Sequence, residues 1–310
     1  MISPGRVQFG IAIPQVLSRP RVETGALQAF LRRAEGLGYH SAWVQEQILG
    51  AAYTLEPVTL LTYAAAVTRT LRLGAAVLLT ALRNPVQLAK SLSTLDHLSE
   101  GRLIVGVGIG GHTRIYPAFG FTAERRVARF AEGLRVMVRL WTEERVTFAG
   151  EFCTLEDAAM EPKPLQEPHP PLWFGARVPA ALKRTVELGD GFIGAGSSTL
   201  AEFTEQVAQL RGYLAAAGRD PSTFPIAKRV YLAVDPDKAR GMERMRECYG
   251  RYYRNPALAD RTALVGDVKE CLEALRAVRA AGAGMILLNP LFDEARHLEL
   301  LAAEILPALA

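Results

Sequence analysis

The segment LRLGAAVLLTALRNPVQLAKSLSTLDHLSEGRLIVGVGIGG, residues 71–111, decides the fold of this chain. Its two short apolar runs flank a longer amphipathic run, a pattern that predicts strand, loop, helix, tight turn and strand. Both apolar runs end in small residues, which are Gly74, Ala75, Ala76, Gly106, Gly108, Gly110 and Gly111. Small residues let a flat ligand approach the backbone, so we expect a shelf for such a ligand where these strands end.

The same alternation of short β-branched runs and longer amphipathic runs continues along the chain, which is typical of βα units around a parallel sheet. Eight strands are expected, within residues 7–13, 39–45, 71–78, 102–108, 171–176, 190–196, 224–234 and 282–290. Eight parallel strands, each followed by a helix, form a TIM barrel, and 310 residues suit that fold. We therefore expect an α/β protein with one (β/α)8 domain over residues 1–310.

Two stretches interrupt this rhythm and are expected to be insertions at the barrel mouth, after strands four and seven. In the first, residues 121–142 are predicted to form a helix, and RVTFAGEFCTLEDA (residues 145–158) a hairpin that turns at Ala149 and Gly150. The prolines of residues 160–175 favour a stiff, extended strap. The second insertion covers residues 235–260.

Composition excludes several classes of partner. A net charge of +4 is too small for a nucleic-acid footprint. The longest apolar stretch, residues 73–82, is far shorter than the ~20 residues of a membrane helix, and the N-terminus MISPGRVQFG lacks the apolar core of a signal peptide. We therefore expect a cytoplasmic protein that binds neither nucleic acid nor membrane.

Cysteine and histidine spacing argues against a metal site. Cys153, Cys248 and Cys271 are odd in number and form no CxxC pair, and the five histidines show no i, i+4 pairing. We expect reduced thiols and no metal.

Residues at strand ends are the first candidates for chemistry, because active sites of TIM barrels lie there. Glu46 follows the second strand, where a partly apolar mouth could tune its pKa toward proton transfer; the alternative is a salt-bridged structural glutamate. His112 follows the fourth strand and could donate a proton or hydrogen-bond a ligand, or it could simply be an exposed loop residue.

An anion site is predicted after the fifth strand. Gly175 and Ala176 allow close approach, Arg177 is cationic, and Pro179 suits the first turn of a helix whose free amides attract anions. An ordinary loop with a surface arginine explains this segment equally well. Residues 194–198, including Gly196 and Ser197, could add a second nest of amides.

Two other motifs are interpreted as structural. GVGIGG (residues 106–111) fits the GxGxxG spacing of a dinucleotide-binding turn, but Pro117 and Gly120 delay the helix that must follow. Asp96, His97 and Arg102 precede the fourth strand, at the end of the barrel where residues serve stability. Nearby, Asn84 and Pro85 suit an N-cap and a first helical position, which leaves Arg83 free for a ligand.

Several motifs in order resemble the luciferase-like flavin and deazaflavin oxidoreductases. They are RLGAAVLLTALRNPVQLAKSLSTLDHLSEGRLIVGVGIGG, EPKPLQEPHPPLWFGA and LGDGFI, and the likeness extends from FGIAIPQ to the eighth strand. The resemblance implies a TIM barrel, often dimeric, that binds coenzyme F420 or FMN at its mouth. It also implies a non-prolyl cis peptide between Ala76 and Val77 behind the flavin ring, and a phosphate-binding segment from Gly175 to Val178.

The chain departs from the family pattern at two places. Many F420-dependent members carry Asp-His after the second strand, where this chain has Glu46 and Gln47. The acidic residue that some sugar-phosphate dehydrogenases carry after the fourth strand is absent, because Gly111 and His112 stand there. This argues against sugar-phosphate oxidation and leaves Glu46 or His112 as the acid or base.

Three functions remain open at this point. The first is F420-dependent hydride transfer to or from a small organic substrate, with the cofactor contacted by Glu46, Ala76, Val77, Gly110, Gly175, Ala176, Arg177, Val178, Gly196 and Ser197. The second is an FMN-dependent monooxygenase that activates oxygen, served by a separate flavin or F420 reductase. The third is a flavin-binding homologue without turnover.

Overall fold

Eight parallel strands close into a barrel in the computed structural model, which describes residues 7–17, 19–111 and 113–309. The strands are β1 (Gln8–Ala12), β3 (Ser41–Val44), β5 (Arg72–Ala75), β7 (Leu103–Gly108), β10 (Leu172–Gly175), β11 (Gly191–Gly194), β12 (Ile226–Val234) and β14 (Met285–Asn289). They pair in that order, and β14 returns to pair with β1. The predicted TIM barrel and all eight predicted strands are confirmed.

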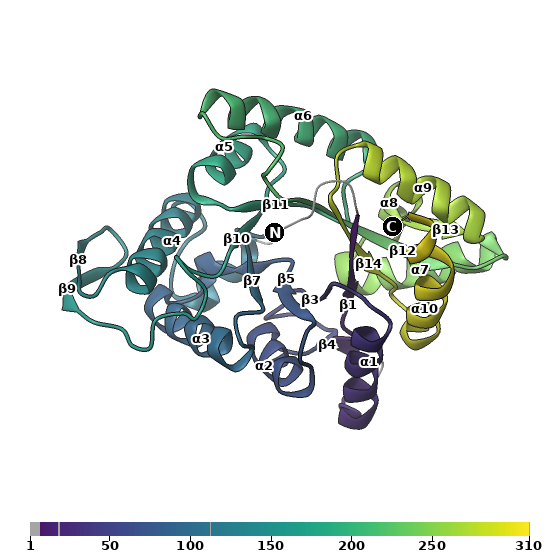
Figure 1. Ribbon diagram of the computed structural model, residues 1–310, viewed down its shortest axis with the longest axis horizontal. Coiled ribbons are helices and arrows are strands. Elements are labelled where there is room, and N and C mark those ends of the chain that lie inside the picture. Colours follow the sequence, from purple (N-terminus) through teal and green to yellow (C-terminus); the bar gives the residue numbers. More distant parts are fainter. Residues whose placement is uncertain (1–6, 18, 112, 310) are drawn as a thin grey trace.

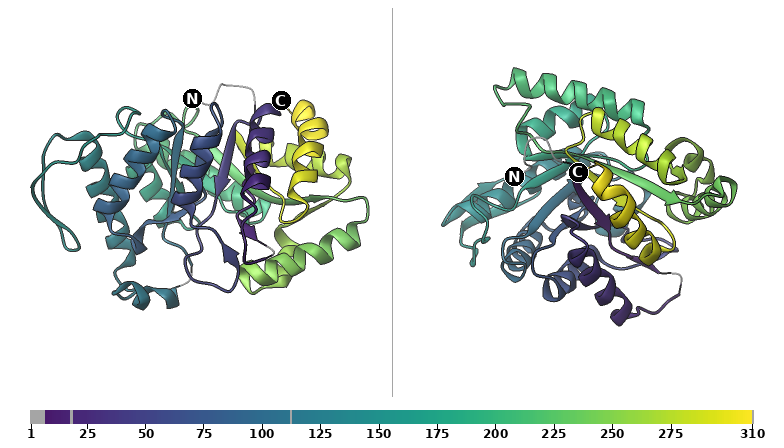
Figure 2. Two further views of the ribbon diagram at one scale, coloured as in Figure 1. Left: turned by 90° about the horizontal axis from the view of Figure 1, so that it is seen from below. Right: turned by 45° about the vertical axis from the view of Figure 1, so that its right-hand side comes forward.

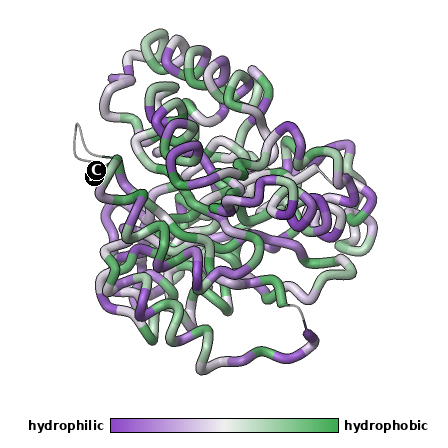
Figure 3. Tube along the Cα trace, turned by 90° about the vertical axis from the view of Figure 1, so that its right-hand side faces the viewer, coloured by the Kyte–Doolittle hydropathy of each residue, from purple (hydrophilic) through white to green (hydrophobic). Residues whose placement is uncertain are grey.

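Helices surround the barrel on its outside (Figure 1). They are α1 (Thr24–Gly36), α2 (Pro57–Val67), α3 (Pro85–Leu98), α4 (Arg126–Thr142), α5 (Pro179–Leu188), α6 (Leu200–Ala216), α9 (Val268–Ala280) and α10 (Glu294–Leu300), and the chain continues through a π-helical turn (Leu301–Ile305) into α11 (Leu306–Leu309). Hydrophobic segments gather toward the strands, whereas the helices alternate between hydrophobic and hydrophilic residues (Figure 3). This is the arrangement that amphipathic helices around a buried parallel sheet require. Among the described residues, no helix has the length and apolar character needed to cross a membrane.

Local signals place the ends of several helices as predicted. Asn84 is the N-cap of α3, where its side chain accepts hydrogen bonds from the amides of Val86 and Gln87, and Pro85 occupies the first turn. Helices α6 and α9 each begin with a capping box.

The first insertion differs from its prediction in two details. Helix α4 begins at Arg126 rather than at residue 121, because a 3-10 segment (Thr113–Phe119) precedes it. The predicted hairpin forms from β8 (Val146–Ala149) and β9 (Thr154–Ala158), but a four-residue loop replaces the tight turn at Ala149 and Gly150. The Glu132 carboxylate stabilises this loop, since it accepts the backbone N–H groups of Glu151, Phe152 and Cys153 at 2.8 Å each.

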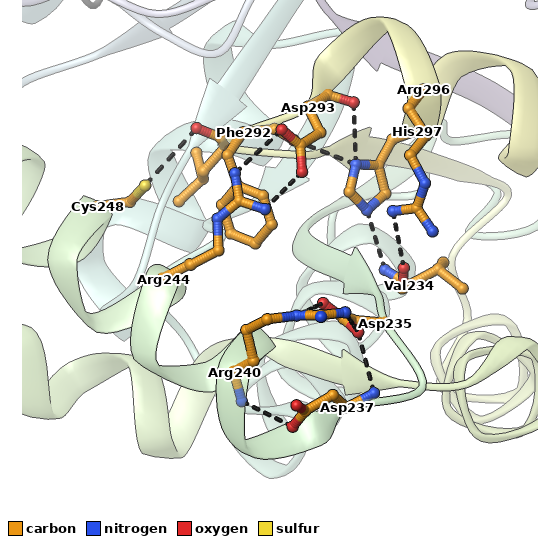
Figure 4. Close-up of polar contacts among 11 residues, drawn as sticks. Val234, Asp235, Asp237, Arg240, Arg244, Cys248, Phe292, Asp293, Arg296 and His297 are labelled. Atoms are coloured by element: carbon orange, nitrogen blue, oxygen red, sulfur yellow. Dashed lines mark hydrogen bonds and ion pairs between the residues drawn. The ribbon is translucent and has the colours of Figure 1, made fainter.

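The second insertion comprises α7 (Lys238–Tyr253), a 3-10 turn (Pro256–Leu258), α8 (Ala259–Thr262) and β13 (Leu264–Gly266). Helix α7 lies across one end of the barrel, seen in the left view of Figure 2. It packs through an apolar cluster of its own, which joins Met245 and Tyr249 to Tyr231 of β12 and to Leu291 after β14. Two ion pairs, Arg240 with Asp235 and Arg244 with Asp293, attach α7 to the ends of those strands (Figure 4).

Smaller elements complete the fold. Strands β2 (Val16–Leu17) and β4 (Tyr53–Thr54) form an antiparallel pair between the loops after β1 and β3. A short strand, β6 (Leu78–Leu79), pairs with the end of β7 and leads into a 3-10 turn (Thr80–Leu82).

The opposite end of the barrel is held by Arg102, as the structural interpretation predicts. Its guanidinium donates to the carbonyls of Ala65, Thr68, Leu71 and Ser99. Asp96 of α3 is buried and accepts two hydrogen bonds from Gln166 of the proline-rich strap. His97 contacts the carbonyl of Lys163 in the same strap. These groups stabilise this end of the barrel, so the functional site is expected at the other end, the mouth.

Candidate active site

A cis peptide bond joins Ala76 and Val77 where β5 ends, at the position that the resemblance implies. Glycines on the neighbouring strands make room for this bulge. A Cβ at Gly106 would stand 1.7 Å from the carbonyl oxygen of Ala75, and a Cβ at Gly108 would stand 2.5 Å from Val77. Gly106 and Gly108 therefore make room for the chain itself, and contact of the small residues with a ligand stays a prediction.

Other glycines of the opening stretch also face protein atoms. A Cβ at Gly74 would clash with the ring of Trp43, which lies 5.8 Å from the ring of Trp173 inside the barrel. Gly110 has a φ of +76°, a left-handed conformation that favours glycine, and it lies against Leu79. Its cofactor contact stays a prediction, and its conformation alone is enough to require glycine there.

A buried arginine on β12 links the bulge to the barrel mouth. The Arg229 guanidinium donates to the Ala76 carbonyl at 3.0 Å, to Gln45 Oε1 at 2.6 Å and to Asn289 Oδ1 at 2.7 Å. It also stacks on the ring of Tyr231, with its carbon 4.8 Å from the ring centroid. Arg229 therefore fixes the orientation of the Ala76 carbonyl and joins three strand ends.

Glu46 is held in a structural ion pair. Its side chain is fully buried and accepts hydrogen bonds from Arg83 and from the backbone amide of Leu79 in β6. Arg83 also pairs with Glu56 at 2.6 Å, so the prediction that Arg83 is free for a ligand is wrong. The geometry matches the alternative interpretation of Glu46, a salt-bridged structural glutamate, and its catalytic role stays a prediction.

The predicted anion segment forms the loop between β10 and α5. Arg177 is exposed and donates to the Ser197 hydroxyl in the loop after β11, so the two candidate loops lie side by side. Helix α5 has no side-chain cap at Val178, although Pro179 starts it as predicted. The exposed Gly175 lies against Val77 of the bulge, whereas Ala176 is buried.

A buried lysine beneath these loops was missed by sequence reasoning. Lys228 of β12 donates to the Ala195 carbonyl and, at 3.0 Å, to the Ser198 carbonyl. Burial, together with the neighbouring Arg177 guanidinium, lowers the pKa of its ammonium to about 7. A Cβ at the predicted Gly196 would meet the ring of Tyr231, so that glycine also serves packing.

A cleft opens beside the bulge, between the ends of β1, β3, β12 and β14. Its polar lining comes from Gln15, Gln45, Arg229, Tyr252, Asn289 and Glu294. Its apolar lining includes Ile13, Pro14, Trp43 and Leu291. Neither Ala76 nor Val77 lines this cleft, and Arg229, which does, connects it to the Ala76 carbonyl.

The remaining candidates have mixed outcomes. His112 lies outside the described residues, and its proposed role stays a prediction.

Sequence reasoning missed Arg229, Asn289 and Glu294, although the rule that barrel strands carry function at their carboxyl ends could have found the last two. Arg229 lies in mid-strand, where a basic residue inside an apolar run was the available signal. Among the described residues, no three metal-binding side chains gather into a possible metal site.

The donor set of the site fits a flat, anionic cofactor. On one side of the bulge, the exposed Arg177 guanidinium and the uncapped amides at the start of α5 suit a phosphate. The bulge itself, at half-buried Ala76 and Val77, offers a small apolar surface of the kind that backs an aromatic ring. F420 and FMN share both features.

Comparison with known proteins agrees with this geometry. The model of the luciferase-like monooxygenase family matches residues 7–284. A protein of Kineococcus radiotolerans named F420-dependent glucose-6-phosphate dehydrogenase is 32% identical over 231 residues, which cover 72% of this chain and 68% of that protein.

Two solved structures share the architecture. Monooxygenase RslO1 from Streptomyces bottropensis is 28% identical, with a TM-score of 0.85 over 98% of this chain and 100% of that one. An F420-dependent secondary alcohol dehydrogenase, solved with an F420-acetone adduct, has a TM-score of 0.87 over 98% of this chain and 99% of that one; at 22% identity it shows the fold alone. On the extent of the family match, this chain belongs to the luciferase-like monooxygenase family and is an oxidoreductase of that class.

Proposed function

We propose that this protein binds coenzyme F420 at the barrel mouth and transfers hydride to or from a small organic substrate. The observation that carries the proposal is the position of the Ala76–Val77 bulge. Val77 lies against Gly175 of the anion loop, and the Ala76 carbonyl is held by Arg229, which lines the cleft. The bulge thus lies against the predicted anion loop and is joined through Arg229 to the cleft.

The residues have distinct roles in this proposal. Arg177 and Ser197 bind the phosphate of the cofactor, and Ala76 and Val77 support its ring. Lys228 holds the loop after β11 in place beneath them. Arg229 keeps the Ala76 carbonyl from turning, while Trp43 and Leu291 exclude water from the substrate side. The bound cofactor supplies the hydride chemistry, and the protein supplies binding, orientation and a dry pocket.

Cofactor titration tests the proposal directly. F420 is added to the purified protein and its fluorescence followed, with FMN in a parallel series. We expect saturable F420 binding with a dissociation constant below about 100 μM, or about −5.5 kcal/mol. Tighter binding of FMN, with oxygen consumed when the flavin is reduced, would favour the monooxygenase instead, and binding of neither cofactor would refute both.

Arg177→Ala should weaken F420 binding by about tenfold at low salt and by less at high salt, because a phosphate contact at an exposed site is screened. Lys183→Ala is the matched control: it removes one exposed cation from α5, the helix that follows the Arg177 loop, where the amine lies over the ring of Tyr213. Equal affinities of the two variants would place Arg177 outside the cofactor site.

The resemblance also suggests a homodimer and a separate reductase, and both belong to the proposal. Analytical sedimentation of the purified protein, which measures its mass in solution, would test for the homodimer. The second applies only if FMN proves to be the cofactor.

A further inference from the structure

Lys228 is a buried cation that forms no ion pair in the part of the chain that the structure describes. It stands in β12, where its neighbours across the sheet are Gly194 of β11 and Ile286 of β14, and its exposed fraction is 4%. Buried charges are normally paired, because an isolated charge loses its hydration without compensation. Lys228 therefore lacks the carboxylate contact that ordinarily accompanies a lysine at this depth.

The hydrogen bonds of the Lys228 ammonium all go to one loop, residues 195–198, between β11 and α6. Nζ donates to the carbonyl of Ala195, to the carbonyl of Ser198 at 3.0 Å and to the Ser198 hydroxyl at 3.3 Å. An ammonium has three hydrogens for these three acceptors, whereas a neutral amine has two. Loss of the proton would leave one acceptor without its donor and weaken the attachment of the loop.

The same loop forms one side of the predicted anion site. Its Ser197 hydroxyl accepts a hydrogen bond from Arg177, which is exposed in the loop before α5. Lys228 thus holds the loop from the buried side, and Arg177 contacts it from the exposed side. A phosphate bound by Arg177 and Ser197 would rest on a loop whose position depends on the charge of Lys228.

The charges around Lys228 favour its neutral form until an anion arrives. Its charged neighbours are Arg177, Arg229 in the same strand and Glu202 of α6. Burial and the two guanidinium groups together lower the pKa of the ammonium to about 7, against the attraction of the Glu202 carboxylate. That carboxylate is itself engaged with Thr199 in the capping box of α6. A phosphate beside Arg177 would offset the repulsion and stabilise the charged ammonium.

We propose that Lys228 is a positioning residue that couples cofactor binding to the uptake of a proton. The inference rests on the proposed function, because it requires a phosphate at Arg177 and Ser197. In the free protein above pH 7, Lys228 is mostly neutral. When the phosphate binds, Nζ takes a proton from the solvent, and the ammonium makes its third hydrogen bond to the loop that carries Ser197.

Calorimetry measures this proton directly. F420 is titrated into the protein in two buffers of different ionisation enthalpy, and the difference between the two binding enthalpies gives the number of protons taken up. The pKa of Lys228 is about 7 in the free protein, and a neighbouring phosphate should stabilise its charged form at least about tenfold. Uptake should then reach at least about 0.4 proton per F420 at pH 8 and add less than about 0.1 at pH 6.

The affinity should follow the same titration. Because the bound state keeps the ammonium charged, F420 should bind most tightly below pH 7, and its dissociation constant should rise at least about eightfold between pH 6 and pH 9. Lys228→Met keeps the length of the side chain and removes its proton. This variant should bind F420 less tightly than wild type at pH 6 and take up at least about 0.4 proton fewer at pH 8.

Lys183→Met is the matched control, because Lys183 is an exposed lysine of α5, and it should keep the wild-type uptake and affinity. Lys228→Gln provides the same comparison if Lys228→Met does not fold. Equal uptake in wild type and the Lys228 variant, or a wild-type affinity that is constant from pH 6 to pH 9, would overturn the inference, while saturable F420 binding would still support the proposed function. A wild-type protein that binds no F420 would overturn both.

Discussion

Glu46 ends a barrel strand in a partly apolar mouth, and its role depends on a residue far away in sequence. Arg83 lies 37 positions further along the chain and reaches back to the Glu46 carboxylate, with Nε 2.9 Å from Oε1. The Leu79 amide uses the other oxygen. Position and residue type favoured acid or base chemistry, but the contact with Arg83 gives the carboxylate a structural role in fixing the loop after β5.

Glu46→Gln should therefore lower the free energy of unfolding by about 3 kcal/mol, because a buried ion pair loses its negative partner. Urea denaturation measures this change. Glu143→Gln is the control, since Glu143 forms an exposed i, i+4 pair with Arg139 and should cost less than about 0.5 kcal/mol. A fully stable Glu46→Gln with a slower chemical step would instead return Glu46 to the mechanism.

Side-chain pairing also explains how much of the site the sequence could reveal. The anion loop was predictable because glycine, arginine and proline stand next to one another in Gly175–Pro179. The contacts of Arg229 were not, because it reaches Gln45, 184 positions away, and Asn289, 60 positions away. The spacing of residues within a short segment does not indicate contacts between strands that are far apart in the sequence.

At the scale of elements, strands were predicted more accurately than the boundaries of the insertions. Each barrel strand has a strong local pattern of apolar residues, and tertiary contacts reinforce it. Helix α4 begins at Arg126 and the hairpin has a wider loop than predicted, because Glu132 captures three amides in the loop between β8 and β9. A carboxylate 18 residues before the loop replaces the tight turn that local residues favour.

Glu132→Ala should loosen this loop without unfolding the barrel. Each lost hydrogen bond to a carboxylate is worth about 1.5 kcal/mol, so exchange of the amides of Glu151, Phe152 and Cys153 should accelerate by at least about tenfold. Hydrogen exchange followed by mass spectrometry resolves the segment. Glu156→Ala, which truncates an exposed glutamate of β9, should leave those rates unchanged; equal acceleration in both variants would contradict the role of Glu132.

At the scale of the whole molecule, the order of the strands follows from the sequence because successive βα units leave one simple way to close the barrel. The side-chain contacts that join the C-terminal helices to the barrel are harder to predict from the sequence. His297 is buried in α10, where its Nε2 accepts the Val234 amide at 3.1 Å and its Nδ1 faces the carbonyls of Phe292 and Asp293 (Figure 4). This pattern requires a neutral ring. Through it the histidine joins α10 to β12.

Two histidines with lowered pKa values, His40 and His297, should make the stability of the protein sensitive to acid. Burial lowers the pKa of His297, and it lowers that of His40 to about 4 with help from the Arg72 guanidinium. Because the unfolded chain binds protons near pH 6.5, folding stability is complete above that pH and is lost as pH falls toward 4. The loss from His40 is about 3 kcal/mol.

Urea denaturation between pH 7 and pH 4 measures this dependence. In His40→Gln and in His297→Gln, the free energy of unfolding should depend less on pH than in wild type. His169→Gln is the control, since His169 is partly exposed, hydrogen-bonds the neighbouring Pro170 carbonyl and packs against the ring of Trp141. Parallel curves for wild type and the first two variants would assign the acid sensitivity to other groups.

Gly106 sets a limit on redesign of the barrel mouth. The Ala75 oxygen stands 1.7 Å from where any Cβ would be, and that oxygen belongs to the backbone, so no rotamer change can relieve the clash. A library that randomises position 106 alone would contain only one folded member. Redesign for a new substrate should therefore vary Leu291, Tyr252 and Glu294, which border the cleft from loops and helices outside the bulge.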